Sequence, residues 1–286
     1  MRYIREVSAT AFTVLDLDKS VEFYTRVMGL ELIEREGSTA RFRGNGARAP
    51  VLSLTQGTEP SIDYLVMIAH NIDAMKGMAD NVESLGYSLI DRPGTEYPEG
   101  KHGFECADPD GFRIRVVGQP ANLVPKAREY QPIGISHVAL NCGDITKVQP
   151  FYEDALGLQF RDTARRTGLV FLGCDNLHHR IALMGGFEKP RVNHVSFEIA
   201  DLESFLRKAG QMVRDGGHLV AGPGRHDTGD NTFAYFADPD ERVVEISTGM
   251  EVIDPDNWTP RMWISGMDQW GFGIPLFNEE MRKRTL

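Results

Sequence analysis

The chain contains an internal repeat that covers most of its 286 residues. Residues 8–32 align on residues 136–160 without a gap, and a second stretch around residue 108 repeats around residue 238 in the same order. Agreement at a nearly constant spacing indicates two copies of one structural unit. The matched positions include Phe23-Tyr24 with Phe151-Tyr152, Gly29-Leu30 with Gly157-Leu158, Pro93-Gly94 with Pro223-Gly224, and Ala107-Asp108-Pro109-Asp110 with Ala237-Asp238-Pro239-Asp240.

Each half of the chain also contains the same short pattern twice. An alternating apolar segment predicts a strand, an acidic residue caps the helix that follows, and short strands come after a glycine. The pattern therefore predicts an α+β protein of four βαβββ modules. The predicted strands begin the modules at residues 9–15, 62–68, 137–141 and 192–199, and the clearest helices cover 73–85 and 202–213.

The repeat also sets the expected domain boundaries. We expect an N-terminal domain at residues 1–120 and a C-terminal domain at residues 132–250. The proline-containing segment 119–131 is the predicted linker. Residues 251–286 match nothing upstream and form a C-terminal extension, which carries all three tryptophans of the chain. These tryptophans are interpreted mainly as packing anchors, with a cover over a pocket or an oligomer contact as the alternative.

Composition narrows the class of protein. The formal net charge is -10, and no basic cluster is longer than the three residues at 282–284, so neither nucleic acid nor an anionic membrane is expected as a partner. No secretory signal or membrane-spanning stretch is evident, and the three scattered cysteines favour reduced thiols. We expect a soluble, cytoplasmic protein that acts on a small molecule.

The two copies differ at three positions that suit a metal. His137 aligns with Ala9, His194 aligns with Tyr64, and Glu245 aligns with Arg115. Each of the three candidate ligands lies on a predicted strand, where alternation can point all three side chains toward one face. Two imidazoles and one carboxylate are the ligand set of a mononuclear non-haem Fe(II) site, and manganese or zinc can occupy the same ligands. A single strand histidine is more often structural, but three at matched positions favour a metal site.

Several motifs together resemble the type I extradiol ring-cleaving dioxygenases of the vicinal oxygen chelate (glyoxalase/bleomycin resistance) superfamily. The resemblance extends over nearly all of residues 1–250. Its most specific parts are Ser136-His137-Val138, Asn193-His194-Val195-Ser196-Phe197, Gly224-Arg225-His226 and the run from Tyr235 through Asp238-Pro239-Asp240 to Glu245.

The resemblance implies both a fold and a site. It implies paired βαβββ modules that curl into two incomplete barrels, with the N-terminal barrel vestigial and the metal in the C-terminal one. It also implies that His179 is the acid/base histidine, that Tyr235 is the active-site tyrosine and that His226 is a further pocket histidine. His178 is expected to support His179 or to face solvent. Glu241 stands at a turn position where the family usually has glycine or proline.

The activity implied by the resemblance is cleavage of a catechol-type ring by O2 at Fe(II), with Mn(II) possible, in aromatic compound degradation, by a homo-oligomer. Three alternatives remain open: a glyoxalase-like isomerase or thiol transferase, a dioxygenase for a quinol or aminophenol, and a protein that binds an aromatic ligand without reaction. The sequence does not identify the catechol. Candidates for the pocket wall are Phe187, His226 and Phe236.

Overall fold

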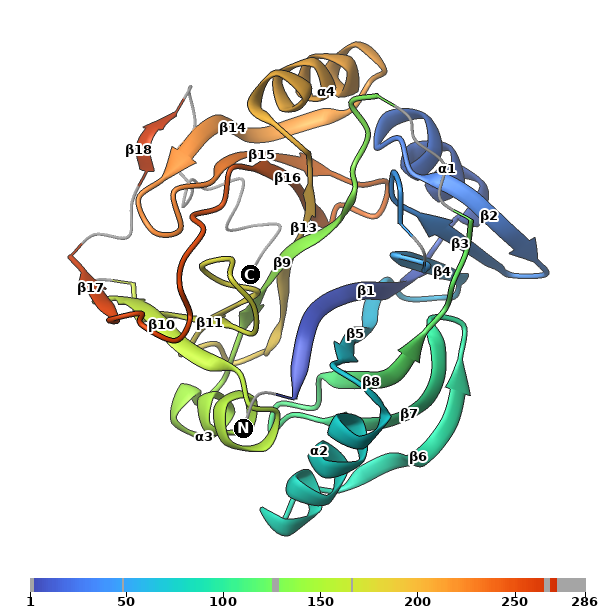
Figure 1. Ribbon diagram of the computed structural model, residues 1–286. Coiled ribbons are helices and arrows are strands. Elements are labelled where there is room, and N and C mark those ends of the chain that lie inside the picture. Colours follow the sequence, from blue (N-terminus) through green and yellow to red (C-terminus); the bar gives the residue numbers. More distant parts are fainter. Residues whose placement is uncertain (1–2, 48, 125–128, 166, 265–267, 272–286) are drawn as a thin grey trace.

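The computed structural model describes residues 3–47, 49–124, 129–165, 167–264 and 268–271. These residues form two curled sheets, one of eight strands and one of ten, and each sheet is built from one half of the chain (Figure 1). No helix among the described residues is long and apolar enough to cross a membrane. The two sheets lie side by side, with the first strands of the two halves near the middle of the molecule (Figure 1).

The first sheet has the strand order β2-β3-β4-β1-β5-β8-β7-β6. The longer of its two α-helices, α2, begins at Asn71, whose side chain accepts a hydrogen bond from the Ala74 amide. The elements of this half are β1 (Ile4–Val14), α1 (Leu17–Glu22), the π-helical turn η1 (Phe23–Val27), β2 (Glu31–Glu36), β3 (Thr39–Arg43), β4 (Leu52–Gln56), β5 (Ser61–Ala69), α2 (Ile72–Ser84), β6 (Leu89–Tyr97), β7 (Gly100–Ala107) and β8 (Arg113–Pro120).

The second sheet has the order β17-β10-β11-β12-β9-β13-β16-β15-β14-β18. Apart from its two outermost strands it repeats the order of the first sheet. Its elements are β9 (Gly134–Asn141), α3 (Ile145–Pro150), the π-helical turn η2 (Phe151–Ala155), β10 (Gln159–Ala164), β11 (Leu169–Gly173), β12 (Ile181–Met184), β13 (Arg191–Glu198), α4 (Leu202–Arg214), β14 (His218–His226), β15 (Thr232–Ala237), β16 (Val243–Thr248), β17 (Arg261–Trp263) and β18 (Asp268–Gly271).

The four predicted modules are therefore confirmed, and the fold is the α+β arrangement of paired βαβββ units in two incomplete barrels. Within each half, the first strands of the two modules pair antiparallel, β1 with β5 and β9 with β13. This pairing places the first strands of both modules at the centre of each sheet. The predicted acidic caps are also present, since Asp16 accepts from the Lys19 amide and Asp144 from the Thr146 amide.

The C-terminal extension contributes its described strands to the second sheet. Strand β17 pairs in parallel with β10 at one edge, and β18 pairs antiparallel with β14 at the opposite edge. One short segment thus covers the two edges that a βαβββ pair leaves free, which protects them from pairing with other chains. The indoles of Trp258 and Trp263 donate to Arg161 O and Asp162 Oδ2, so they anchor the segment as expected.

The two halves contact each other through reciprocal tyrosine–aspartate hydrogen bonds. Tyr24, in the π turn of the first half, donates to Asp238 Oδ2 of the second half at 3.0 Å. Tyr152, at the repeated position, donates to Asp108 Oδ2 of the first half at 3.1 Å. Both tyrosines are fully buried. The halves therefore pack like the two subunits of a symmetric dimer, in which each contact occurs twice.

The same turns make a second reciprocal contact. Asp110 accepts from the Gly143 amide at 2.9 Å, and Asp240 accepts from the Leu15 amide at 3.3 Å. The symmetry breaks at the next positions: Gly111 (φ +90°) is replaced by Glu241 (φ +66°), which keeps the left-handed backbone that favours glycine. Phe112 is replaced by Arg242, whose Nε donates to Asp238 Oδ2 at 2.9 Å.

This asymmetry predicts unequal effects of removing the two tyrosine hydroxyls. Tyr152→Phe should lower the free energy of unfolding by about 1–3 kcal/mol, because Asp108 loses a donor and, unlike Asp238, has no arginine bonded to it among the described residues. Tyr24→Phe should cost less. Urea unfolding of both variants at one pH measures the difference, and an equal loss would contradict the explanation.

The cost of Tyr152→Phe should also depend on pH. Burial raises the pKa of Asp108 to about 6, against hydrogen bonds from the Phe112 amide and Tyr152 that lower it. A raised pKa means that this carboxyl's contribution to stability falls as the pH rises from about 4 to 6. Losing the tyrosine hydroxyl raises the pKa further, so the difference between wild type and Tyr152→Phe should be larger at pH 7.5 than at pH 5. Unfolding curves at both pH values test this.

Candidate metal centre

Three strands at the centre of the second sheet carry the predicted ligands. His137 lies on β9, His194 on β13 and Glu245 on β16, and these strands are neighbours in that order. Their ligand atoms all lie within 4.8 Å of one another, and the structure has no other such group of His, Cys, Asp or Glu among its described residues. All three residues are buried from solvent or nearly so, and Glu245 is completely inaccessible. The fold therefore brings together the three side chains that the repeat comparison singled out.

The contacts of the three residues suit a bound cation. Nε2 of His137 and Nε2 of His194 are each 3.1 Å from Glu245 Oε2 and 3.3 Å from each other. Neither carboxylate oxygen of Glu245 has a hydrogen-bond partner among the described residues. A buried carboxylate without partners is costly, and a metal ion would satisfy all three groups at once. The residues present thus fit a divalent metal.

Neighbouring side chains orient both imidazoles for this task. Nδ1 of His194 is 2.8 Å from Asn193 Oδ1, and Asn193 is held in turn by Asn141 through Nδ2 at 3.0 Å. Nδ1 of His137 is 3.2 Å from the hydroxyl of Ser136. An N–H donated from each Nδ1 to these oxygens leaves the Nε2 lone pair of each ring facing the centre, as in other metal-binding histidines.

The electrostatics agree with an anionic carboxylate at Glu245. Burial alone would raise the pKa of Glu245, but His137 and His194 outweigh burial, and the pKa lies well below the usual range. Burial lowers the pKa of His194, against a smaller opposite effect of Glu245. Ionised glutamate and neutral histidine are the forms that bind divalent metals.

The matching place in the first sheet is filled by an arginine. The guanidinium of Arg115, at the position of Glu245, stacks 3.5 Å from the ring centre of Tyr64 and 4.6 Å from that of Tyr97. Its Nε donates to Glu105 Oε2 at 2.6 Å, and Glu99 lies 3.9 Å away. A fixed side-chain cation therefore occupies the first half where the second half offers three ligands.

His179 lies beside the candidate metal ligands. Its ring centre is 4.8 Å from that of His137, and the ring of Phe171 makes an edge contact with it, with the ring centres 4.9 Å apart. The side chain is almost completely buried, and burial, followed by the neighbouring histidines His137 and His178, lowers the pKa of His179 well below its usual value. His179 is therefore a neutral imidazole at the edge of the centre.

Tyr235 and His226 form a second pair next to the ligands. The ring of Tyr235 is 5.1 Å from that of His194, and its hydroxyl is 3.2 Å from Nε2 of His226. Nδ1 of His226 is 2.8 Å from Oδ1 of Asp268, on the added strand β18. His226 also stacks on Phe233, with ring centres 4.0 Å apart. Burial, followed by the charges of Glu245 and Asp268, raises the pKa of Tyr235, which keeps its hydroxyl protonated.

Sequence reasoning did not identify every residue near the site. Asp162 and Asp268 contact His178 and His226, but nothing in their local sequence marks them, since their partners lie far away along the chain. The prediction that Phe236 lines the pocket is wrong. Its side chain packs in the main core, on the opposite face of β15 from Tyr235. His178 is fully buried, so it supports the site and does not face solvent.

Known proteins with a similar sequence or structure are consistent with this geometry. Residues 7–116 and 134–246 match the family described as the Glyoxalase/Bleomycin resistance protein/Dioxygenase superfamily. The chain is 25% identical to a manganese-dependent 2,3-dihydroxybiphenyl 1,2-dioxygenase from Geobacillus genomosp. 3, over 87% of this chain and 86% of the relative. It is 27% identical to metapyrocatechase 2 from Cupriavidus necator, over 78% of this chain and 76% of the relative.

Two solved structures illustrate the range of similar folds. One is a Mn(II)-bound glyoxalase from Novosphingobium aromaticivorans, with a TM-score of 0.89 and 30% identity over 96% of this chain and 93% of that one. The other is a homoprotocatechuate 2,3-dioxygenase from Brevibacterium fuscum, with a TM-score of 0.85 and 21% identity over 99% of this chain and 92% of that one. The second likeness is in fold alone.

The geometry predicts one bound divalent metal ion per chain. Wild-type protein, stripped of metal and then titrated with Mn(II), should take up one equivalent, whereas His194→Ala and Glu245→Ala should lose binding because two ligands cannot hold the ion. Calorimetry and metal analysis after desalting measure this. His218→Ala, which changes an exposed histidine in the same half, is the control. Full metal uptake by Glu245→Ala would contradict the assignment.

The two arginines bonded to Glu105 should contribute unequally to the stability of the protein. Arg115→Met should destabilise the protein by about 3–5 kcal/mol, because it leaves the buried Glu105 without its inner cation. Arg113→Met removes the outer, half-exposed partner of the same carboxylate and should cost only about 0–1 kcal/mol. Denaturant unfolding compares the two variants, and equal losses would mean that the inner arginine is not what neutralises Glu105.

Proposed function

The chain belongs to the glyoxalase/bleomycin resistance protein/dioxygenase superfamily, and from this premise we propose that it is an extradiol dioxygenase that cleaves a catechol-type ring with O2. The observation that carries the proposal is the set of His137, His194 and Glu245 around one buried point, with the neutral His179 beside it. Relatives that span most of the chain add support, since several are named as dioxygenases of hydroxylated biphenyls.

We propose Fe(II) as the resident metal, with Mn(II) as the alternative that the manganese-dependent relative supports. His137, His194 and Glu245 would hold it on one side and leave positions open for ligands. When bound, such a metal supplies a Lewis-acid and redox centre at which the two hydroxyl groups of a catechol and O2 can meet. The remaining chemistry falls to the side chains around it.

His179 is the proposed acid and base. Its neutral ring can accept the proton that a catechol hydroxyl loses on binding, and can return a proton as the ring-opened product forms. A neutral imidazole suits both steps because the same ring nitrogen can accept a proton and return it. His179 is almost completely buried, and Phe171 is one of the rings in contact with it.

Tyr235 and His226 are proposed to bind and orient the substrate. The hydroxyl of Tyr235 stays protonated, so it can donate a hydrogen bond to an oxygen atom that carries developing negative charge. The contact of His226 with Asp268 fixes its proton on Nδ1, which leaves Nε2 as the acceptor of the Tyr235 hydroxyl until a substrate oxygen takes its place. The pair therefore has a defined direction of donation.

A glyoxalase-type reaction is the second candidate, because the 30% identical structure is that of a Mn(II)-bound glyoxalase. Sites for that chemistry are expected to use a second carboxylate ligand. Among the described residues, the cluster here contains one carboxylate only, which favours the dioxygenase. A dioxygenase for a quinol or aminophenol would use the same metal ligands and differ only in substrate. Assays with catechols and quinols distinguish it from the proposed enzyme.

The activity predicts a coloured product. Metal-free protein is loaded with Fe(II) without oxygen, and in parallel with Mn(II), and then mixed in air with catechol, 3-methylcatechol or 2,3-dihydroxybiphenyl. We expect a yellow ring-cleavage product and one molecule of O2 consumed per molecule of product, recorded by absorbance and an oxygen electrode. Metal-loaded protein that consumes no O2 with any of these diols would contradict the proposal, and turnover of a hemithioacetal would favour the glyoxalase candidate.

The proposed role of His179 predicts that its substitution lowers activity without loss of the metal. His179→Gln should retain its metal but lose activity by about 10²- to 10⁴-fold, because proton transfer contributes a factor of that order. His218→Gln should behave as wild type. Metal analysis alongside steady-state kinetics separates loss of binding from loss of chemistry, and a His179→Gln protein without metal would overturn its placement outside the ligand set.

A homo-oligomer remains a prediction of the family resemblance, to be tested by light scattering.

A further inference from the structure

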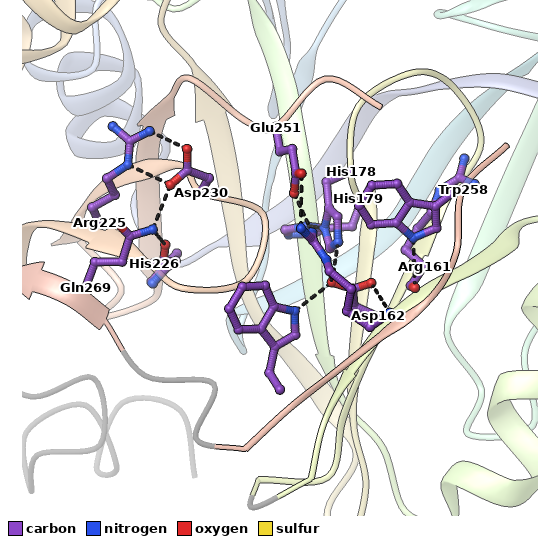
Figure 2. Close-up of polar contacts among 12 residues, drawn as sticks. Arg161, Asp162, His178, His179, Arg225, His226, Asp230, Glu251, Trp258 and Gln269 are labelled. Carbon is purple, nitrogen blue, oxygen red and sulfur yellow. Dashed lines mark hydrogen bonds and ion pairs between the residues drawn. The ribbon is translucent and has the colours of Figure 1, made fainter. Parts of the chain in front are cut away.

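A second buried aspartate lies behind the proposed acid/base histidine. Nδ1 of His179 is 3.0 Å from Nδ1 of His178, and Nε2 of His178 is 3.0 Å from Oδ2 of Asp162. The last contact has the distance of an ion pair without the angles of a hydrogen bond. All three residues are buried, and Asp162 and His178 are completely inaccessible to solvent. Figure 2 shows the three in one group, apart from the group around His226.

The C-terminal segment holds Asp162 in place. Nε1 of Trp263 donates to Asp162 Oδ2 at 2.6 Å, and Arg261 donates to the same carboxylate from its backbone N and its Nε at 2.8 and 2.9 Å. Burial would raise the pKa of Asp162, but these contacts and that of His178 outweigh burial and lower it. Asp162 is therefore an ionised carboxylate whose position depends on β17.

These contacts determine the tautomers of both rings. With a single N–H on His178, that proton faces the carboxylate 3.0 Å from Nε2, because the ionised carboxylate would repel a lone pair there. Nδ1 of His178 is then an acceptor, and Nδ1 of His179 must donate to it. The proton of His179 is thereby fixed on Nδ1, and its lone pair on Nε2. No described residue hydrogen-bonds this Nε2, which is the ring nitrogen left for the substrate.

We propose that Asp162 and His178 are positioning residues that hold His179 in the Nδ1–H tautomer, so that Nε2 is ready to accept a proton from the substrate. The inference rests on the proposed function for its kinetic consequence, but the tautomers themselves are a property of the metal-free chain. A carboxylate that orients a histidine through a hydrogen bond is a general device in proton-transfer sites. Here it acts through one intervening imidazole.

The structure also explains why a plain packing role is insufficient. Asp162 receives three donors from the C-terminal segment and needs no histidine to be neutralised. His178 also has a second anchor, since its backbone N donates to Glu251 O. The side chain of His178 could therefore be a buried apolar ring without loss of the strand pairing around it. What an apolar ring cannot supply is an acceptor for Nδ1 of His179.

The first test is spectroscopic and needs no metal and no turnover. In metal-free protein with ¹⁵N-labelled histidine, two-bond ¹H–¹⁵N correlations distinguish the two tautomers of each ring. Signals are assigned by their loss in His178→Phe and His179→Gln. We expect the Nε2–H tautomer for His178 and the Nδ1–H tautomer for His179. The reverse pair of tautomers in the wild-type protein would overturn the proposal, whatever reaction the enzyme catalyses.

The second test removes the charge that holds the tautomers. Oδ2 of Asp162 faces His178 and also accepts from Trp263 and Arg261. In Asp162→Asn the carbonyl oxygen can take the place of Oδ2 and keep these two donors, but the negative charge that holds the proton of His178 on Nε2 is lost. Both rings should then populate the other tautomer as well, and kcat should fall by about 10- to 100-fold with KM within about threefold, the range for outer partners of metal-bound histidines. Metal content should not change.

Two further variants provide the control and an independent check. Glu251→Gln removes the other carboxylate partner of Arg261 but leaves Asp162 charged, so its tautomers and kcat should match wild type. Trp263→Phe removes one donor to Asp162 and should have an effect between the two. Wild-type kcat in a folded Asp162→Asn protein would overturn the positioning role. Absence of turnover in wild type would instead overturn the proposed function, and the spectroscopic test would still decide the tautomers.

Discussion

Each half of this protein completely buries a glutamate on a strand of its curled sheet, and a buried carboxylate must be neutralised. In the first half the anion is Glu105, and the cation is Arg115, which is part of the chain and stacks between two tyrosines. In the second half the anion is Glu245, and the groups around it are two imidazoles with lone pairs facing inward. The two halves therefore neutralise a buried carboxylate in different ways. The first half uses the side chain of Arg115, and the second half offers a site for a metal ion, which can exchange with solvent.

This difference separates the roles of the two halves. The arginine makes the first half complete without any ligand, so it can serve as a scaffold. It contributes Asp108 and Asp110 to contacts with the second half and receives Asp238 and Asp240 in return. Because these contacts are reciprocal and partly buried, the relative position of the two sheets is fixed by hydrogen bonds at two matched places. The second half is thereby free to devote its central strands to ligands.

The C-terminal segment completes the second half in two ways. Its strands β17 and β18 pair with the two outer edges of the sheet, and the residues on them reach back toward the centre from both sides. Arg261 and Trp263 fix Asp162 behind His178, and Asp268 contacts His226. The segment that lies outside the repeat thus orients His178 and His226, two histidines close to the candidate metal ligands.

The sequence alone determined the repeat, the four modules and the three candidate ligands. It could do so because a repeated chain provides its own reference: His137, His194 and Glu245 stand out only against Ala9, Tyr64 and Arg115. Local patterns also predicted the caps at Asp16 and Asp144, since an N-cap acts on residues two or three positions away.

The tertiary structure decided whatever depends on partners that are distant in sequence and have no copy in the other half. The contacts of Asp162 with His178 and of Asp268 with His226 join segments 16 and 42 residues apart, and neither aspartate belongs to a recognisable motif. The reciprocal tyrosine–aspartate contacts were likewise visible in the sequence as matched residues but not as partners, because a repeat shows which residues correspond and not which ones touch. Contact across the two halves is set by how the sheets pack, and packing is a property of the folded chain.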